Sequence, residues 1–301
     1  MKKFLHLLVI AVVVSSCSKD TPDIADPNMR SDISAVPTHF SQNLLIEKFT
    51  SSSNGQCPKA DLISDSLQRY NSGRVFCAAI HINDLLVDSG IISPYSGQNI
   101  IDSIYNPIMA YPGGMINRNF NQAITYGIGS WSGSVQTGIG QAPACGLALE
   151  AKDFRNGAIY LTVHVGFSDF MYGDYRIHGY IVENAWASND SLYDQLNDFS
   201  SQGTTPDSTL SLYGLNDTLH VYTYRDVVRK VFTNKRTGDL IPQNYMNPGS
   251  QYVGGYSIDL TGINTSNCSI IVFVDKYATT PSGHRIINVQ KVSFGAVQDW
   301  N

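Results

Sequence analysis

The feature that most constrains the fold is a change in the spacing of apolar residues partway along the chain. Before about residue 140 the clearest runs are short and almost continuously apolar, namely LLIEKF at 44–49 and RVFCAAIHI at 74–82. Such runs are typical of parallel strands buried on both faces. From about Pro143 the apolar residues alternate with polar ones, which is typical of antiparallel strands with one face on a core. The sequence therefore predicts an α/β part followed by an all-β part.

The first part has the order of elements of a thioredoxin-like domain. Residues 58–70 are expected to form a helix, because their apolar residues share one stripe and Pro58 is tolerated in a first turn. A second helix is expected at 97–109, a strand after Pro112, and a Gly-interrupted helix within 121–135. In thioredoxin-like folds the proline before the third strand is usually cis and faces a cysteine loop. Pro112 takes that place here.

The second part predicts an antiparallel β-sandwich, since short alternating runs are separated by turn sequences. These runs occupy 158–167, 174–182, 268–275 and 285–294. In the last run the apolar phase shifts between Val289 and Val292, which predicts a β-bulge. Residues 191–214 are polar and give no prediction. The fold class is thus α/β plus all-β, with a thioredoxin-like domain at 43–140 and a β-sandwich domain at 141–301.

The stretch SSSNGQCPKA, residues 51–60, resembles a dithiol redox loop with one sulfur missing. Cys57 and Pro58 stand where the second cysteine and the proline of a Cys-x-x-Cys-Pro loop would be, but Asn54 replaces the first cysteine. That first cysteine is the nucleophile in such enzymes, and an amide forms neither a thiolate nor a disulfide. We predict a scaffold without dithiol chemistry and no catalytic residue. Single-thiol chemistry at Cys57 remains the alternative.

The N-terminus predicts export and lipid anchoring. Two lysines, an apolar run and the sequence VSSC describe a lipoprotein signal peptide at 1–16, with Cys17 as the lipidated residue. An ordinary secreted protein is the alternative. Residues 17–42, rich in Ser, Asp and Pro, are expected to be a flexible tether. Removing 1–16 takes away two lysines and no acid, so the formal charge moves from −5 to −7. This acidic balance gives no reason to expect nucleic acid as a partner.

Two further pairs of residues are candidates for structural or metal chemistry. Cys145 and Cys268 both fall at strand starts, which makes them candidates for a disulfide, and buried free thiols are the other interpretation. His164 and His178 are expected on the outward faces of neighbouring strands, where they would make weak candidates for metal ligands. Two histidines do not make a site, so no metal or other cofactor is predicted.

Four blocks of the chain, in order, resemble the Omp28-related outer-membrane lipoproteins. They are LLIEKFT with CPKADLISDSLQRY and RVFCAAIH, then YPGGMINR, HVYTYRDVVRKVFTNKRTGDLIP and IINVQKVSF. The resemblance covers about Asn43 to Phe294. It implies a thioredoxin-like domain joined to a β-sandwich, outer-membrane localisation through the N-terminal lipid, and a receptor or adhesin role.

The expected function is therefore non-catalytic binding of an unknown ligand or protein at or near the cell surface. CSKD, at the lipid-bearing end, partly resembles the signal for surface-exposed lipoproteins, with inner-leaflet anchoring as the alternative. Homodimerisation is expected only by analogy with the family. Two other functions stay open, an envelope enzyme or chaperone that uses the Cys57 thiol and a structural subunit of an envelope complex.

Overall fold

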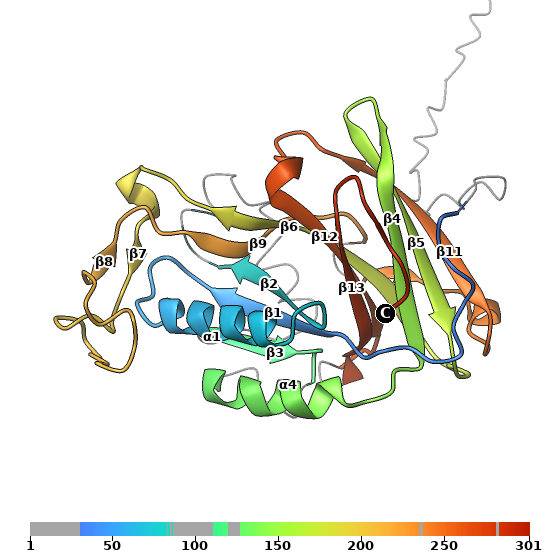
Figure 1. Ribbon diagram of the computed structural model, residues 1–301, viewed down its shortest axis with the longest axis horizontal. Helices are drawn as coiled ribbons and strands as arrows, with labels where there is room; N and C mark the ends of the chain where they lie inside the picture. Colours follow the sequence, from blue (N-terminus) through green and yellow to red (C-terminus); the bar gives the residue numbers. More distant parts are fainter. Residues whose placement is uncertain are drawn as a thin grey trace, which may run out of the picture.

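The computed structural model describes residues 31–82, 84, 86, 111–119, 127–234, 237–280 and 283–301 (Figure 1). The expected signal peptide, Cys17 and the helix predicted at 97–109 lie outside these residues. No helix within the described ranges is long and apolar enough to cross a membrane.

A large mixed sheet takes strands from both parts of the chain. Its order in the described chain is β13-β12-β6-β9-β2-β1-β3, with β10 paired to β6. Its strands are β1 (Leu44–Thr50), β2 (Val75–His81), β3 (Gly113–Ile116), β6 (Tyr175–Trp186), β9 (Tyr224–Val231), β10 (Asp239–Leu240), β12 (Cys268–Lys276) and β13 (Arg285–Ser293). The parallel pair β1 and β2 has every residue buried, as its continuous apolar runs predict. β2 pairs with β9, so hydrogen bonding runs across the domain boundary expected near residue 140.

A smaller antiparallel sheet packs on the sandwich half of the large one. Its order is β11-β5-β4-β14, and its strands are β4 (Cys145–Arg155), β5 (Ala158–Phe167), β11 (Gln251–Asp259) and β14 (Val297–Gln298). Alternate residues of β4 and β5 point into a shared apolar core with β6 and β12. The apolar residues of these strands recur at every second position because only one face of each strand meets the core. The structure is mostly β-sheet with several sheets, which agrees with the β-rich fold expected for the second part of the chain.

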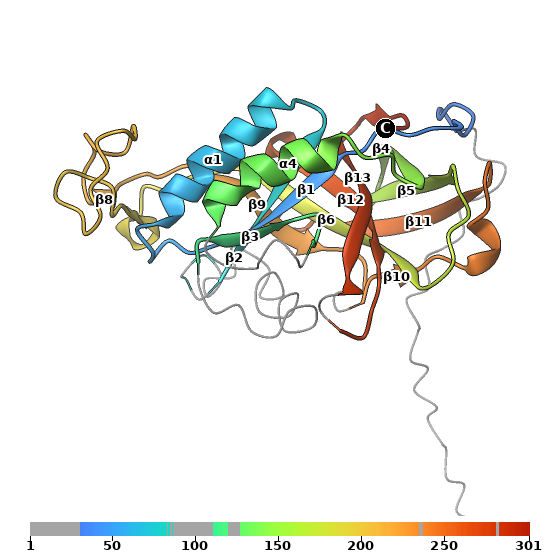
Figure 2. The ribbon, with the colours of Figure 1, turned by 90° about the horizontal axis from the view of Figure 1, so that it is seen from below.

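Two helices lie on one face of the large sheet (Figure 2). α1 (Cys57–Tyr70) begins with Pro58 at a position where its missing N–H costs nothing, and it buries Ala60 and Leu67. α4 (Trp131–Ile139) follows the 3₁₀ turn η2 (Ile128–Ser130) and realises part of the helix expected within 121–135. Both helices pack on the apolar face of β1, β2 and β3. β3 begins immediately after the cis peptide bond Tyr111–Pro112.

The polar residues that gave no prediction form an excursion between β6 and β9. It contains the 3₁₀ turn η3 (Ser191–Tyr193) and the short pair β7 (Gln195–Leu196) and β8 (Thr218–Leu219). In Figure 1 this excursion lies at the left end of the molecule, beside the start of α1. We refer to residues 191–222 as the excursion. Two more 3₁₀ turns, η4 (Gln243–Tyr245) and η5 (Thr265–Asn267), precede β11 and β12.

The segment expected to be a flexible tether is packed from residue 31 onward. Phe40 is 8% exposed and fills the space above two glycines of the small sheet, where a Cβ on Gly146 would lie 2.1 Å from its ring. Ser34 accepts a hydrogen bond from the Trp300 indole through its carbonyl at 2.9 Å, and Phe40 contacts the same indole. Residues 31–43, called the strap below, therefore cover the outer face of the small sheet. The strap has no apolar period, so its sequence gives no sign of this packing.

The predicted bulge occurs in β13, but at a different residue. The β12–β13 register pairs Val274 with Asn288 and Asp275 with Ile286, so Ile287 is the extra residue. Val289 and Val292 lie on opposite faces, and both faces of β13 are buried in apolar clusters. The apolar phase shift at Val289 to Val292 reflects burial on both faces and is not a bulge.

Candidate functional site

The degenerate loop holds its cysteine in the interior. Cys57 is the first residue of α1 and is 0% exposed. The backbone N–H of Ser51 donates to its Sγ at 3.4 Å. Burial raises the pKa of the Cys57 thiol to about 11, and the hydrogen bonds from Thr50 and Ser51 only partly offset this. Cys77, on β2, has its pKa raised to about 12 by burial. Neither thiol has the depressed pKa of a nucleophile.

Asn54 uses its amide to hold the loop against the turn that precedes β3. Its Nδ2 donates to the carbonyl of Tyr111 at 2.8 Å, and its Oδ1 accepts from the backbone N–H of Gln56 at 2.9 Å. Tyr111 is joined to Pro112 by the cis bond, so Pro112 does face the loop as its position in the sequence predicted. A hydrogen bond between two segments therefore stands where a dithiol enzyme carries its reactive sulfur.

The excursion covers the outside of this loop through backbone hydrogen bonds. The N–H of Leu196 donates to the carbonyl of Ser52 at 3.1 Å, and the N–H of Asp198 donates to the carbonyl of Gly55 at 3.0 Å. The approach is so close that a Cβ on Gly55 would lie 2.3 Å from the Asp198 carboxylate and 2.7 Å from its backbone nitrogen. No pattern in the polar segment predicted this cover. A substrate has no direct path to Cys57 from this side.

Beneath the loop lies a buried charge pair that leaves no free acid or base. Lys48 of β1 pairs with Asp61 of α1, and Tyr222 of the excursion donates to the same carboxylate at 2.6 Å. Burial alone would lower the pKa of Lys48, but the Asp61 carboxylate outweighs it and holds the pKa above its usual value. Burial and Asp61 both raise the pKa of Tyr222. Lysine and tyrosine both stay protonated, so the group is structural.

A second buried network ties the helical half of the molecule to the sandwich. Arg118, which follows β3, forms two hydrogen bonds with Glu47 at 2.8 and 2.9 Å and an ion pair with Asp275 of β12 at 3.2 Å. Tyr180 donates to the same Glu47 at 3.0 Å, and His284 Nδ1 lies 3.0 Å from Asp275. Burial would raise the pKa of Asp275, but Arg118 outweighs it and holds that pKa well below the usual range.

The two histidines predicted as metal candidates lie apart. His164 is on β5 of the small sheet and contacts Glu150 at 3.0 Å, whereas His178 is on β6 of the large sheet and lies 3.6 Å from Asp275. β5 pairs with β4 and β11 and β6 pairs with β9, β10 and β12, so the expected juxtaposition across a hairpin is wrong. Both are buried: His164 packs against the Trp300 indole, and His178 stacks on the Phe273 ring of β12. No group of three His, Cys, Asp or Glu side chains in the described ranges could hold a metal ion.

The candidate disulfide between Cys145 and Cys268 is not formed. Cys145 and Cys268 are free, buried thiols in the sandwich core. The Cys145 carbonyl accepts from Asn288 in β13, whereas Cys268 precedes Ser269, which pairs with Ser293. Those two points on β13 are about five residues apart, or roughly 16 Å, which exceeds the span of a disulfide.

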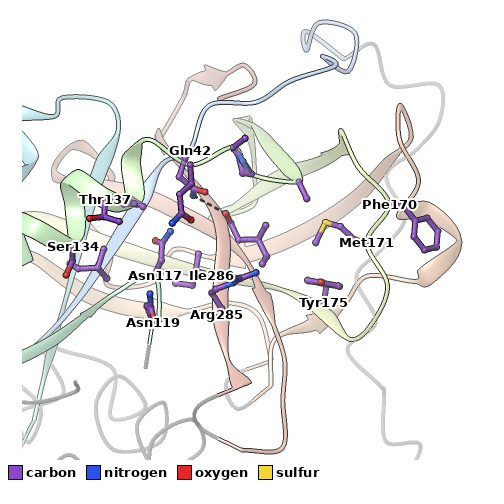
Figure 3. Close-up of a pocket in the computed structure, with 18 of the residues that line it drawn as sticks. Gln42, Asn117, Asn119, Ser134, Thr137, Phe170, Met171, Tyr175, Arg285 and Ile286 are labelled. Carbon is purple, nitrogen blue, oxygen red and sulfur yellow. Dashed lines mark hydrogen bonds between the residues drawn. The ribbon is translucent and has the colours of Figure 1, made fainter. Parts of the chain in front are cut away.

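An open cleft lies between α4 and the turn that connects β5 to β6 (Figure 3). Its volume is about 430 Å³. One wall carries polar residues of α4 and of the end of β3, and the other carries residues 170–172 and Tyr175. Arg285, at the start of β13, points across the floor toward Tyr175 in Figure 3. Its lining comes from five separate segments, so no motif in the sequence predicts this cleft.

Comparison with known proteins agrees with this architecture. A family model described as Outer membrane protein Omp28 matches residues 99–298, about two thirds of the chain. The match begins after β2, so the loop with Asn54 and Cys57 lies outside it. No curated protein matches the chain.

Two solved structures are similar in fold. One is HBP35 of Porphyromonas gingivalis, with a TM-score of 0.63 and 16% identity, over 86% of this chain and 77% of that one. The other, a protein of Agrobacterium tumefaciens, has a TM-score of 0.44 and 12% identity over 85% of this chain and 96% of its own, which is too low to support an argument. At such identities the likeness to HBP35 shows the fold alone. The family match has a wider consequence: the chain belongs to the Outer membrane protein Omp28 family.

Proposed function

We propose that the protein is a lipid-anchored outer-membrane protein, exposed at the cell surface, whose role is to bind a ligand without catalysis. Membership of an outer-membrane family and the lipobox-like VSSC sequence ending at Cys17 support the location. The order β1, α1, β2 and β3, with cis Pro112 facing the loop, supports a thioredoxin-like origin for the first half. A receptor or adhesin role and a homodimeric state belong to the proposal by resemblance to the family.

The observation that carries this proposal is the closed loop. Asn54 bonds the loop to Tyr111 on one side, the excursion bonds to loop carbonyls on the other, and Cys57 is fully buried. With a pKa of about 11, roughly one Cys57 thiol in ten thousand is ionised at pH 7. The scaffold is thus retained without the reactive group, while the cleft beside α4 stays open.

Alkylation of the full chain tests the non-catalytic part. The protein is treated with iodoacetamide between pH 4 and 9, and labelled cysteines are identified by mass spectrometry. We expect Cys57 to stay unlabelled until the protein unfolds, with Cys57→Ser as the control for assignment. Rapid labelling of Cys57 below pH 7 would contradict the proposal and favour a thiol enzyme.

Metabolic labelling tests the anchor. Cells expressing the full chain should incorporate radioactive palmitate into it, and Cys17→Ser should abolish incorporation and release the protein from the outer-membrane fraction. Cys57→Ser should change neither result and serves as the matched cysteine control. Digestion of intact cells by an added protease is expected if the protein is surface-exposed, and resistance would place it on the inner leaflet.

A further inference from the structure

We infer that the cleft beside α4 is a binding site for a small acidic sugar, a polyhydroxylated ring that carries a carboxylate. This inference deepens the proposed binding function and rests on it. The volume of about 430 Å³ lies within the range of small-molecule sites and suits one or two sugar rings. The charge, the unpartnered polar groups and the rim of the cleft all suit such a ligand.

The cleft is positively charged although the chain is acidic. Among the described residues that line it there is no Asp or Glu, and Arg285 is the one charged side chain. The guanidinium of Arg285 makes no hydrogen bond or ion pair with any described residue, and the side chain is exposed. The nearest acid in the adjoining turn, Asp174, is bonded twice to Arg176 at 2.7 and 2.8 Å. A carboxylate entering the cleft therefore meets an unshared planar cation, the geometry that favours bidentate pairing.

Tyr175 offers a second donor at the same place. Its ring is 8% exposed, and its hydroxyl makes no hydrogen bond within the described residues. Burial raises the pKa of Tyr175, and the Arg285 charge opposes that rise, so the hydroxyl is protonated at neutral pH and able to donate. Figure 3 shows Arg285 and Tyr175 pointing toward one another across the floor of the cleft. Together they suit one carboxylate.

The opposite wall is suited to hydroxyl groups. Asn119, Gln141 and Thr137 present side chains that have no hydrogen-bond partner in the described parts of the chain. Amides donate and accept at once, as does a hydroxyl, so they match the alternating donors and acceptors of a sugar ring. A plain fatty carboxylate would leave these groups unsatisfied, which is unfavourable.

The rim supplies aromatic surface. Tyr172 is 78% exposed and Phe170 56% exposed, both in the turn beside the cleft. Exposed aromatic rings of this kind provide a flat apolar face against which the C–H face of a sugar can lie. A cation, a pair of donors, free amides and rim aromatics together point to an acidic sugar more than to a peptide, whose backbone would need a strand edge or an apolar pocket.

Ligand-observed NMR tests the inference by measuring the binding of sodium glucuronate and sodium galacturonate to the detergent-solubilised full chain. At least one uronate should bind about tenfold more tightly than its neutral counterpart, glucose for glucuronate and galactose for galacturonate, in which a hydroxymethyl group replaces the carboxylate. Cyclohexanecarboxylate, which has the charge without the hydroxyls, should bind more weakly than the uronate. Arg285→Gln should weaken uronate binding about tenfold and leave glucose unchanged, and Tyr175→Phe should weaken it about threefold.

Arg155→Gln is the matched control, because Arg155 is exposed at the tip of the β4–β5 hairpin, where it bonds to Asp153, and does not line the cleft. It should bind uronate as the unaltered protein does. The inference is wrong if neither uronate binds at about 10 mM, a concentration that detects even weak complexes. It is equally wrong if Arg285→Gln binds uronate normally, or if cyclohexanecarboxylate binds as well as the uronate.

These outcomes separate the inference from the proposed function. Failure of uronate binding with Cys57 still unreactive would overturn the acidic-sugar site and leave a non-catalytic binding role standing. Fast alkylation of Cys57 below pH 7 would overturn the proposed function whatever the uronates do.

Discussion

At the scale of single residues, Asn54 shows how one side chain can turn a reactive position into a structural one. Its amide joins the loop to the residue before Pro112, and the loop carbonyl of Asn54 itself accepts from Gln195 of the excursion at 3.0 Å. Three segments far apart in sequence thus meet at this residue. A cysteine there would offer none of these amide hydrogen bonds through its side chain.

Asn54→Ala is expected to lower the free energy of unfolding by about 1 kcal/mol, because the Tyr111 carbonyl loses its donor. Urea denaturation followed by circular dichroism measures the difference. Asn189→Ala, at an exposed residue, should change stability by less than about 0.5 kcal/mol. Equal stability of the two variants would show that the Asn54 bond contributes nothing.

His178 makes stability depend on pH. Burial lowers the pKa of His178 and the Arg118 charge adds to the effect, while the Asp275 carboxylate, 3.6 Å away, opposes it. The folded protein therefore keeps this imidazole neutral where the unfolded chain, near pH 6.5, takes up a proton. Stability should fall by on the order of 1–2 kcal/mol as the pH drops from 7 to 5. Denaturation at each pH measures this slope.

His178→Gln should flatten that slope even if it lowers stability at pH 7, because glutamine does not titrate. His39→Gln, at an exposed strap residue, should keep the slope of the unaltered protein. An unchanged slope in His178→Gln would mean that another group causes the acid sensitivity. Below about pH 4, Asp275 should add a further loss, since its folded-state pKa is depressed and the network with Arg118 needs its charge.

At the scale of elements, the excursion acts as a cover whose fit depends on a residue without a side chain. Gly55→Ala would drive a methyl group into Asp198, including its backbone nitrogen, so the cover must shift. We expect stability to fall by about 1–3 kcal/mol and Cys57 to become alkylated at least about tenfold faster at pH 9. Gly214→Ala, where a Cβ meets open space, is the matched control and should behave like the unaltered protein. Unchanged labelling in Gly55→Ala would show that the excursion does not guard the thiol.

Local pattern predicted the elements better than their partners. The runs at 44–49, 158–167 and 285–294 gave strands because hydrophobic period depends on neighbours within one strand. Which strands pair depends on contacts between distant segments. The sequence pattern therefore could not predict that His164 lies apart from His178, or Cys145 from Cys268. Burial on both faces of β13 also shifted the apolar phase of its sequence, which was misinterpreted as a bulge between Val289 and Val292. The outward histidines were correctly phased, yet buried, because a strand pattern cannot show what lies on the outer face.

The candidate sites divide in the same way. Asn54, Cys57 and Pro58 were found because a loop of known spacing lies in consecutive sequence, and Pro112 was found from the order of the elements. The cleft was missed, since Gln42, Asn119 and Arg285 belong to segments that only the fold brings together. The excursion over the loop was missed for the same reason, since it bonds through backbone groups that carry no sequence signal.

At the scale of the whole molecule, the large sheet joins what the sequence divides near residue 140. Glu47 and Arg118 of the first part are satisfied by Asp275 and Tyr180 of the second. A fragment of residues 31–140 would keep the Arg118–Glu47 pair but lose its buried partners Asp275 and Tyr180, and it would leave the outer edge of β2 unpaired. Together these losses cost several kcal/mol. We expect the fragment to remain unfolded by amide NMR while the full chain shows dispersed signals. A dispersed spectrum from the fragment would instead support two independent domains.

The strap sets how far the molecule can stand from a bilayer. Ser31 and Asp32 donate hydrogen bonds to Glu150 at 3.1 and 3.0 Å, so the strap is attached to the small sheet at residue 31. If Cys17 carries the lipid, thirteen residues separate it from Ser31, and even fully extended they span at most about 45 Å. In Figure 1 the strap lies at the end opposite the excursion. The protein would then stand on the membrane with the small sheet nearest the bilayer and the excursion farthest from it. The exposed Leu192 and Leu215 of the excursion would be among the first groups that an approaching cell or molecule contacts.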